Sequence, residues 1–503
     1  MASRLSAENS LIQSFEIMSK NDREEVDDNI TVNQALCDIM NNYIPSTLTM
    51  YIEFAVTFLN VLFISMLDDP ALVSGCGLGV FLITNVIFTW DMGLCGAIDT
   101  LVSQAYGRKD YKLCGTYLNT SRILFTLLFI PQAIILLNSN SLLKFFNQPK
   151  ESAEIAQKYV HATLFGAFLN MQFEANRRFM VSQGEFPPVL CTMIGTTLFH
   201  ICGLYIFVLH LGWGISGVGI ITAVTFTLNF IATSVYINSK KKQVISDKWF
   251  FLDQEGFQRI PEFLKYGIPA ALMLIFEILG YDMMTLFSGW IGTEEQAANI
   301  IMFQIWILIC MNTVGITYSS TGFIGNSLGG NRPRSAKAYA YSTLLFGLLI
   351  TACILFVYYL IRRTAIGQFS SDRSVTDLVF CSFPCYILAI FSDAGQGLGG
   401  GILRTIGYQH FASIIQFISM WIIYFPLAYI FAFELGYGFK GLWFAAPIGP
   451  GLTNIGFILL VLFSNWESIA KNASASTNQS SQSNPELPLE GLPLKEIAEK
   501  EVI

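Results

Sequence analysis

Carboxylate side chains lie inside stretches of the sequence that are otherwise apolar. Glu277 stands in LMLIFEILGYDMM, Asp282 follows it by five residues, and Asp393 stands in AIFSDAGQGLGGG. In a lipid bilayer such a charge is costly unless it faces a cavity, takes up a proton or is paired. The sequence places no Lys or Arg deep in these stretches, so the acids indicate the binding of protons or cations.

Other acids lie within or at the ends of further apolar stretches. Glu53 belongs to the first stretch, and Asp91 and Asp99 belong to the second. Asp99 ends its stretch beside Gln104 and Arg108, so we expect it to make a structural pair. For Asp91 a structural and a functional role remain equally open.

The position of Asp282 relative to Glu277 follows from helix geometry. Five residues at about 100° each place the two side chains roughly 140° apart around a helix. They therefore do not share one face closely. We expect them to line different parts of one cavity.

The chain as a whole is too apolar for a water-soluble protein. Of its 503 residues, 53% are hydrophobic and 13% are charged, about half of the roughly 25% charged fraction that is usual in soluble proteins. Runs of about 20 apolar residues, the length that crosses a bilayer, occur roughly twelve times between residues 47 and 464. We therefore predict an all-α polytopic membrane protein with about twelve transmembrane helices.

The two halves of the sequence repeat each other. Pro45 and Pro269 are 224 positions apart, as are Glu53 and Glu277 and the segments LHLGWGISG (209–217) and FELGYGFKG (433–441). With six spans in each half, both halves have the same topology. This predicts two six-helix bundles related by a pseudo-two-fold axis along the membrane normal, an architecture of transporters.

Domain boundaries follow from these runs and from the polar segments between them. The two ends are polar and lack an apolar face, which is typical of disorder. We predict a disordered tail, a bundle, a cytosolic linker, a second bundle and a second disordered tail, at residues 1–42, 43–237, 238–262, 263–465 and 466–503.

Charge and cysteine usage limit the partners and the orientation. The net charge is −7, so the chain does not favour nucleic acid. Four His and scattered Cys form no metal or disulfide pattern, and we expect no metal and no cofactor. Most Lys and Arg lie in alternate loops, the longest being 238–262. Such loops are cytosolic, and an even number of spans places both termini there.

Four segments together resemble the multidrug and toxic compound extrusion (MATE) transporters, most closely their eukaryotic branch. The resemblance covers residues 43–465, in order and with the family spacing. Its segments are AIDTLVSQAYGRKDYKLCGTYLNTSRIL (97–124), RRFMVSQGEFPPVL (177–190), GGGILRTIGYQHFASIIQF (399–417) and FELGYGFKGLWFAAPIG (433–449).

The resemblance implies roles for particular residues. The seventh-helix acids of the eukaryotic branch fall on Glu277 and Asp282, with Tyr281 beside them, and the tenth-helix acid falls on Asp393. Gln304 stands where some animal members have an eighth-helix acid, and it cannot titrate. Motif positions with a structural role fall on Asp99, Gln104, Gly107, Gln183 and Arg404.

The N-terminal half has a less direct counterpart. Glu53 lies near the first-helix acid that some prokaryotic members use, whereas Asp91 matches no family position. Whether these two acids take part in ion coupling stays open at this point.

The implied function is secondary active export of small organic, mainly cationic, compounds or xenobiotics in exchange for H⁺ or Na⁺. The expected partners are this substrate, the coupling cation and the lipid bilayer, and we expect a monomer in the plasma membrane or a vacuolar or other endomembrane. An enzyme is not expected, because the sequence has no HExxH, paired-Asp or Gly-x-Ser-x-Gly motif. The alternative is a lipid-linked saccharide flippase or metabolite transporter of the same superfamily. A flippase would need basic residues along its cavity, and the sequence places none deep in the spans.

Overall fold

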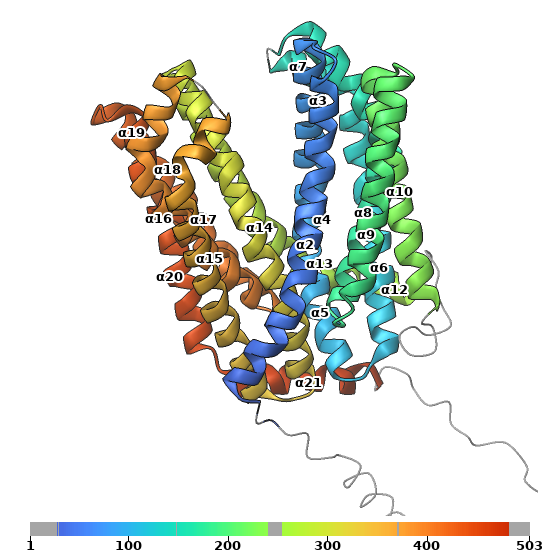
Figure 1. Ribbon diagram of the computed structural model, residues 1–503. Helices are drawn as coiled ribbons and strands as arrows, with labels where there is room; N and C mark the ends of the chain where they lie inside the picture. The colour runs from blue at the N-terminus through green and yellow to red at the C-terminus, as the bar shows by residue number, and fades with distance from the viewer. Residues whose placement is uncertain (1–27, 29, 147, 240–253, 370–371, 482–503) are drawn as a thin grey trace, which may run out of the picture.

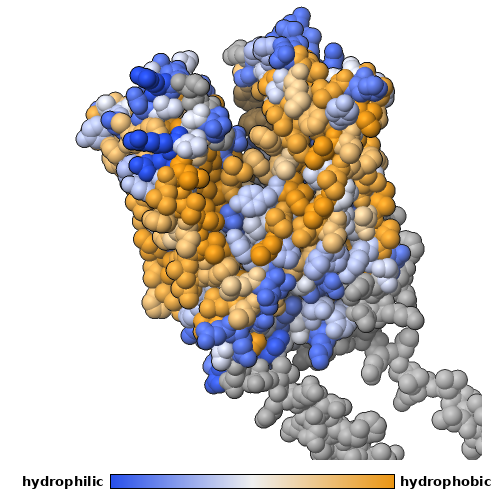
Figure 2. Space-filling model, viewed as in Figure 1, coloured by the Kyte–Doolittle hydropathy of each residue, from blue (hydrophilic) through white to orange (hydrophobic). Residues whose placement is uncertain are grey.

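The protein consists of two helical bundles that meet at one end and diverge toward the other. The computed structural model describes residues 28, 30–146, 148–239, 254–369 and 372–481. Figure 1 shows the bundles as the two arms of a V. In Figure 2 an apolar band runs across the visible face, and hydrophilic residues cover both ends. A notch between the bundles enters this band from the open end of the V.

The helices confirm the predicted membrane architecture. Within the described residues, 11 helical segments are long and apolar enough to cross a bilayer. Helix α8 (Lys150–Val181) adds one more of membrane length. Its sequence is less apolar because it carries Glu174, Arg177 and Arg178 among its buried side chains. The all-α polytopic prediction is therefore confirmed.

The N-terminal bundle is built around α8, which packs against α3, α6 and α10. The second span is a continuous stack of shorter segments that includes a π-helical turn. The elements of this bundle are α2 (Val32–Ser65), α3 (Pro70–Ile83), η1 (Thr84–Phe88), α4 (Thr89–Leu94), α5 (Gly96–Gly107), α6 (Tyr111–Leu137), α7 (Ser139–Phe145), α9 (Pro187–Leu204), η2 (Tyr205–His210) and α10 (Gly214–Ser239).

The C-terminal bundle is built around α14 and α16, which pack against each other. Its elements are α13 (Ile260–Ile291), α14 (Thr293–Gly329), α15 (Pro333–Phe369), α16 (Arg373–Thr405), α17 (Gln409–Phe417), η3 (Ile418–Tyr424), α18 (Phe425–Tyr429), η4 (Ile430–Glu434), α19 (Gly438–Ala445) and α20 (Ile448–Phe463), followed by α21 (Trp466–Ser481). The short helix α12 (Gln254–Gln258) precedes α13 and packs mainly on α6 of the N-terminal bundle (Figure 1).

The backbone repeats where the sequence repeats. Gly212 and Gly214 have φ of 67° and 52°, and Gly436 and Gly438, 224 positions later, have φ of 70° and 55°. This left-handed conformation costs Gly little and other residues more. The π-helical segments η2 and η4 immediately precede these two turns. Equal conformations at equal spacing support two bundles of the same topology.

The described parts of the two predicted tails, residues 30–42 and 466–481, are mostly helical, whereas 1–27 and 482–503 lie outside the described residues. Helix α2 already begins at Val32, with Thr31 and Gln34 forming a capping box. The tail predicted from 466 onward starts instead with α21, on which Trp466 and Ile469 are buried. Helix α21 packs on α14 and α15. Its short apolar face is covered by residues distant in the sequence, so composition alone predicts disorder there. The predicted linker lies partly outside the described residues, at 240–253.

Small residues hold the two bundles together at the closed end of the V. A Cβ atom at Gly107 of α5 would lie 2.7 Å from the Cα of Asn326 on α14, and one at Gly329 would lie 2.8 Å from the carbonyl carbon of Gln104. Helices approach this closely only where side chains are absent. The Gln104 amide also donates to the carbonyl of Thr405 on α16 at 3.0 Å. The motif residues of α5 therefore form one of the contacts between the bundles, alongside those of α2 with α14 and of α4 with α13.

We expect Gly107→Val to open this end. Forcing a larger side chain between packed helices costs about 1–3 kcal/mol, and each 1.4 kcal/mol is about tenfold in the equilibrium. The distance between spin labels on α5 and α14, measured by double electron–electron resonance, should therefore become longer. Gly195→Val is the control, because a Cβ at Gly195 has no neighbour within 4 Å. Unchanged distances in Gly107→Val would contradict this account.

Candidate functional site

Asp393 is a buried acid at the centre of the C-terminal bundle. It lies on α16 and is 6% exposed. The Tyr281 hydroxyl donates to its Oδ1 at 2.5 Å, and the Trp306 Nε1–H and Cys310 Sγ–H donate to its Oδ2 at 2.9 and 3.1 Å. These donors come from α13 and α14, so the carboxylate joins three helices. Burial is tolerated because hydrogen bonds replace the lost water.

Aromatic rings surround this carboxylate. Phe303 stacks on Trp306 with ring centroids 5.6 Å apart and planes 6° apart. Tyr281 lies against both rings, at 5.6 Å and 4.9 Å. Tyr281 and Phe303 are partly exposed, whereas Trp306 is buried. The faces of such rings attract cations, so the rings and the acid offer two complementary kinds of contact to an organic cation.

Glu277 lies one helical turn from Tyr281 on α13 and faces a cavity between the bundles. It is partly exposed, lies beside the Gln396 side chain, and interacts electrostatically with Asp393 and Arg404. Gln396 also donates to Asp393 at 3.5 Å. This amide therefore connects the two carboxyl groups, and a proton or cation bound by one changes the charge felt by the other.

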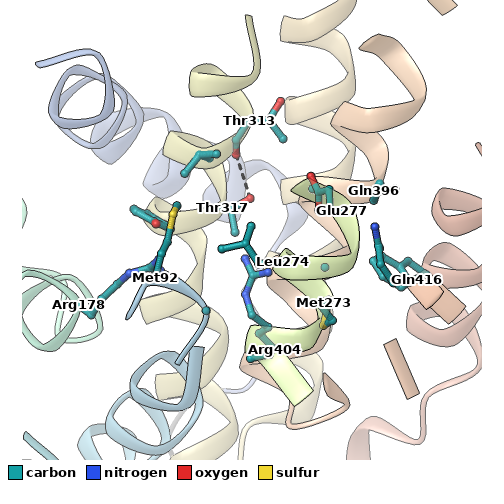
Figure 3. A pocket seen from close by; sticks show the side chains of 17 residues that line it. Met92, Arg178, Met273, Leu274, Glu277, Thr313, Thr317, Gln396, Arg404 and Gln416 are labelled. Carbon is teal, nitrogen blue, oxygen red and sulfur yellow. Dashed lines mark hydrogen bonds between the residues drawn. The ribbon is translucent and has the colours of Figure 1, made fainter. Parts of the chain in front are cut away.

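The cavity at Glu277 is small and polar at its ends. Its volume is about 90 Å³, enough for several water molecules but below the roughly 300–1,000 Å³ of a drug-sized pocket. Figure 3 shows side chains from both bundles converging on it. The side chains that line the cavity include Met92, Arg178, Glu277, Gln396 and Arg404.

Two of the predicted binding residues lie apart from this centre. Asp282 on α13 is partly exposed and Gln304 on α14 is exposed. Among the described residues, neither makes a hydrogen bond or ion pair with another side chain. The structure therefore brings Tyr281, Glu277 and Asp393 together and leaves Asp282 and Gln304 outside the group.

The N-terminal bundle holds a buried network of opposite charges. Arg177 on α8 is 1% exposed in its side chain, and its Nη1 donates to Glu53 Oε2 at 2.8 Å. Its Nε donates to Glu174 at 3.1 Å. The next residue, Arg178, pairs with Asp99 at 2.9 Å. The guanidinium of Arg178 also lies over the ring of Tyr318, 3.8 Å from its centroid.

These pairs were not expected from the sequence, which places both arginines in a loop rather than buried at the end of a span. The apolar run predicts an end near 176, but α8 continues to Val181 and buries Arg177 and Arg178. Their partners are on α2 and α5, and such pairing is invisible in one sequence. Glu174 was missed for the same reason. Its spacing of three and four residues from the two Arg is the one local signal of the network.

The structure also locates the remaining motif residues. Asp99 is paired with Arg178 rather than with Arg108, its neighbour in sequence. Gln183 donates to the carbonyl of Phe179 at 3.1 Å and ends α8 locally. Arg404 has its side chain at the cavity, and its carbonyl accepts a hydrogen bond from Thr100 of the other bundle at 2.5 Å.

Known proteins resemble this chain over most of its length. The MatE family model matches residues 45–206 and 269–430, again 224 positions apart. Protein DETOXIFICATION 16 of Arabidopsis thaliana is 27% identical over 86% of this chain and 88% of its own. Multidrug and toxin extrusion protein 1 of Oryctolagus cuniculus is 26% identical over 86% of this chain and 76% of its own.

Solved structures share the fold. The eukaryotic MATE transporter AtDTX14 has a TM-score of 0.81 at 21% identity, covering 88% of this chain and 98% of that one. The Vibrio cholerae MATE transporter VcmN has a TM-score of 0.76 at 17% identity, covering 89% and 99%. Since the MatE model matches more than half of the residues in two repeats of equal length, the chain belongs to the MATE family of membrane transporters.

Proposed function

We propose that this protein exports small organic cations from the cytosol in exchange for protons. The observation that carries the proposal is the linked pair of acids in the C-terminal bundle, Glu277 and Asp393, next to the aromatic rings of Tyr281 and Phe303. No cofactor is required, since the coupling ion itself supplies the charge. The relatives are named for detoxification and for multidrug and toxin extrusion, which supports an efflux role.

Exchange follows from competition for one group of acids. When the V faces the outside, protons bind at Glu277 and Asp393 and remove the negative charge that held the cation. The cation then leaves between the bundles. After the bundles rearrange, the acids release their protons to the cytosol and bind a new cation. A ligand shifts such an equilibrium only through different affinities for the two states, and the bound proton supplies that difference.

The orientation is part of the proposal. The closed end of the V carries Arg108 and Lys109 in the loop after α5 and Arg332 in the loop after α14, and basic loops stay in the cytosol. The notch between the bundles in Figure 2 then opens away from the cytosol. This conformation is accordingly the one that releases substrate and takes up protons.

A second candidate is export of an anionic compound, such as a lipid-linked saccharide. Arg178 and Arg404 line the cavity, so the basic residues that seemed to be missing from the sequence are present. Arg178, however, is already paired with Asp99, and Arg404 interacts electrostatically with Asp99 and Glu277. Because acids accompany both arginines, we place the cation first.

The test is transport by the purified protein in proteoliposomes. A fluorescent organic cation should accumulate under an imposed pH gradient, and a Na⁺ gradient alone should have no effect. If a Na⁺ gradient alone drives accumulation, the coupling ion is Na⁺ and not the proton. If neither gradient drives accumulation of the cation and the protein instead transports an anionic lipid precursor, the second candidate is favoured.

We expect Phe303→Leu to weaken cation binding with little effect on folding. Leu keeps an apolar side chain of similar size but loses the ring face, and one cation–π contact contributes about 0.5–2 kcal/mol. The KM for an organic cation should rise roughly 2- to 30-fold at that energy. Phe303→Tyr should retain the parent KM. Phe165→Leu, at a side chain that is 67% exposed, is the control for loss of a ring elsewhere. An unchanged KM in Phe303→Leu would remove this ring from the site.

A further inference from the structure

Asp91 is an acid of the N-terminal bundle that the proposed mechanism does not use. It lies on α4, in the middle of the second span, and is 1% exposed. Both of its carboxyl oxygens are buried without a hydrogen-bond partner in the described part of the chain. Asp99, about two helical turns further along the same span, is also buried but is paired with Arg178 at 2.9 Å. The two acids therefore have different environments.

Charged groups from neighbouring helices face Asp91. Those that interact with it electrostatically are Glu174, Arg177 and Arg178 of α8 and Glu53 of α2. Asp99 of α5 belongs to the same network through Arg178, and the Cys95 thiol lies between α4 and α5. On α13 the contact is apolar, with Ala271 against Gly93.

The arginines of this network are already engaged by other acids. Arg177 holds Glu53 and Glu174, and Arg178 holds Asp99. Arg178 reaches Glu174 only at 3.9 Å. Around Asp91 the described network therefore contains the guanidinium groups of Arg177 and Arg178 and four carboxyl groups, the fourth being Asp91. Arg404 approaches this network through Asp99 and also interacts with Glu277. An ionised carboxylate buried without hydrogen bonds or a counter-ion is strongly unfavourable, and such a group takes up a proton instead.

We propose that Asp91 is a second proton-carrying site, in the N-terminal bundle, protonated in the conformation seen here. Asp91 itself does not line the cavity between the bundles, but the next two residues, Met92 and Gly93, do, and the proposed path of the proton to water leads to this cavity. The geometry also indicates what would release it. Arg178 rests on Tyr318 of α14 at 3.8 Å, a contact between the two bundles.

Rearrangement of the bundles separates Tyr318 from Arg178. The guanidinium is then free to turn from Tyr318 toward Asp91 while it keeps Asp99. The Asp91 O–H bond breaks, its proton passes to water in the cavity, and the carboxylate that remains is balanced by Arg178. In the reverse step water returns a proton to Asp91 and Arg178 returns to the ring. This part of the inference rests on the proposed proton exchange.

Infrared spectroscopy of the full chain in lipid nanodiscs tests the protonation directly. The variant Glu277→Gln/Asp393→Asn removes the two acids of the C-terminal site, so that remaining protonated carboxyl groups lie elsewhere. We expect this variant to retain a protonated-carboxyl C=O band at neutral pH without Na⁺, and Asp91→Asn in that background to lose it. Asp91→Glu should retain the band at a shifted frequency. Asp68→Asn, at an exposed acid outside this network, should leave the band in place.

Other results would overturn the proposal. If Asp91→Asn leaves the band unchanged, Asp91 is not protonated. If adding NaCl removes the band, the site binds Na⁺ instead of a proton. Asn is the uncharged counterpart of protonated Asp, so size-exclusion chromatography should show that Asp91→Asn folds. If it does not fold, the Asp91→Glu shift decides the assignment.

A transport measurement tests the coupling role separately. In single-site variants with the C-terminal acids intact, protons released per cation bound should fall by one in Asp91→Asn and remain at the parent value in Asp282→Asn. An unchanged count with a lost band would make Asp91 a fixed proton and overturn the coupling. If the parent itself shows no proton-driven accumulation, the proposed function fails, whereas the infrared result on Asp91 still stands.

Discussion

Glu277→Gln should reduce proton-driven accumulation of an organic cation to the level of protein-free vesicles. The substitution keeps the size and the polarity of the side chain beside Gln396, but the amide neither takes up a proton nor attracts a cation. Exchange requires that proton and cation compete for the same acid. Without that acid the pH gradient no longer drives transport of the substrate. Initial rates of dye accumulation in proteoliposomes measure the effect.

Asp282→Asn is the matched control for Glu277→Gln. Asp282 lies on the same helix, five residues on, yet makes no hydrogen bond or ion pair with other described side chains and is partly exposed. Its variant should transport at close to the parent rate. If Glu277→Gln transports as well as the parent, or if Asp282→Asn is the inactive one, the acids have been assigned wrongly.

Arg177→Met should cause the largest loss of stability among single substitutions in the N-terminal bundle. Arg177 is fully buried and holds both Glu53 and Glu174. Removing one partner of a buried ion pair leaves uncompensated charge and costs about 3–5 kcal/mol. The free energy of unfolding, measured by titration with denaturing detergent in mixed micelles, should fall by about that amount.

Two further variants separate loss of charge balance from loss of packing. Lys112→Gln removes a salt bridge to Glu255 whose side chains are 59% and 45% exposed, and an exposed pair contributes at most about 1 kcal/mol. Adding Glu174→Gln to Arg177→Met removes one stranded acid and should restore part of the lost stability. If Arg177→Met costs no more than Lys112→Gln, the network does not hold the bundle together.

Much of the fold was predictable because bilayers impose simple rules on sequence. Apolar runs of spanning length set the helices, and a spacing of 224 between Pro45 and Pro269 set the repeat. Helix α8 is the informative exception. It buries Arg177 and Arg178 in pairs, so hydropathy alone underestimates where it ends. Helix α21 is ordered by packing on α14 and α15, which a local reading of the sequence does not reveal.

The candidate site was predicted in part. Glu277 and Asp393 stand out as acids in apolar sequence, and the structure links them through Gln396. Sequence equivalence, by contrast, misleads about Glu53. It occupies the place of Glu277 in the other half, yet it is held by Arg177 at 2.8 Å. The difference depends on a partner from α8, because position in a repeat does not determine which side chains meet.

The π-helical segments bear on how the two halves arose. Segments η2 (Tyr205–His210) and η4 (Ile430–Glu434) occupy corresponding places, each just before a turn with two left-handed glycines. A π-segment within an α-helix accommodates one additional residue in its turn. Two independent insertions at one place are a less economical history than a single insertion in an ancestral half-length gene. Their matching positions fit one insertion that preceded the duplication of a half-length chain.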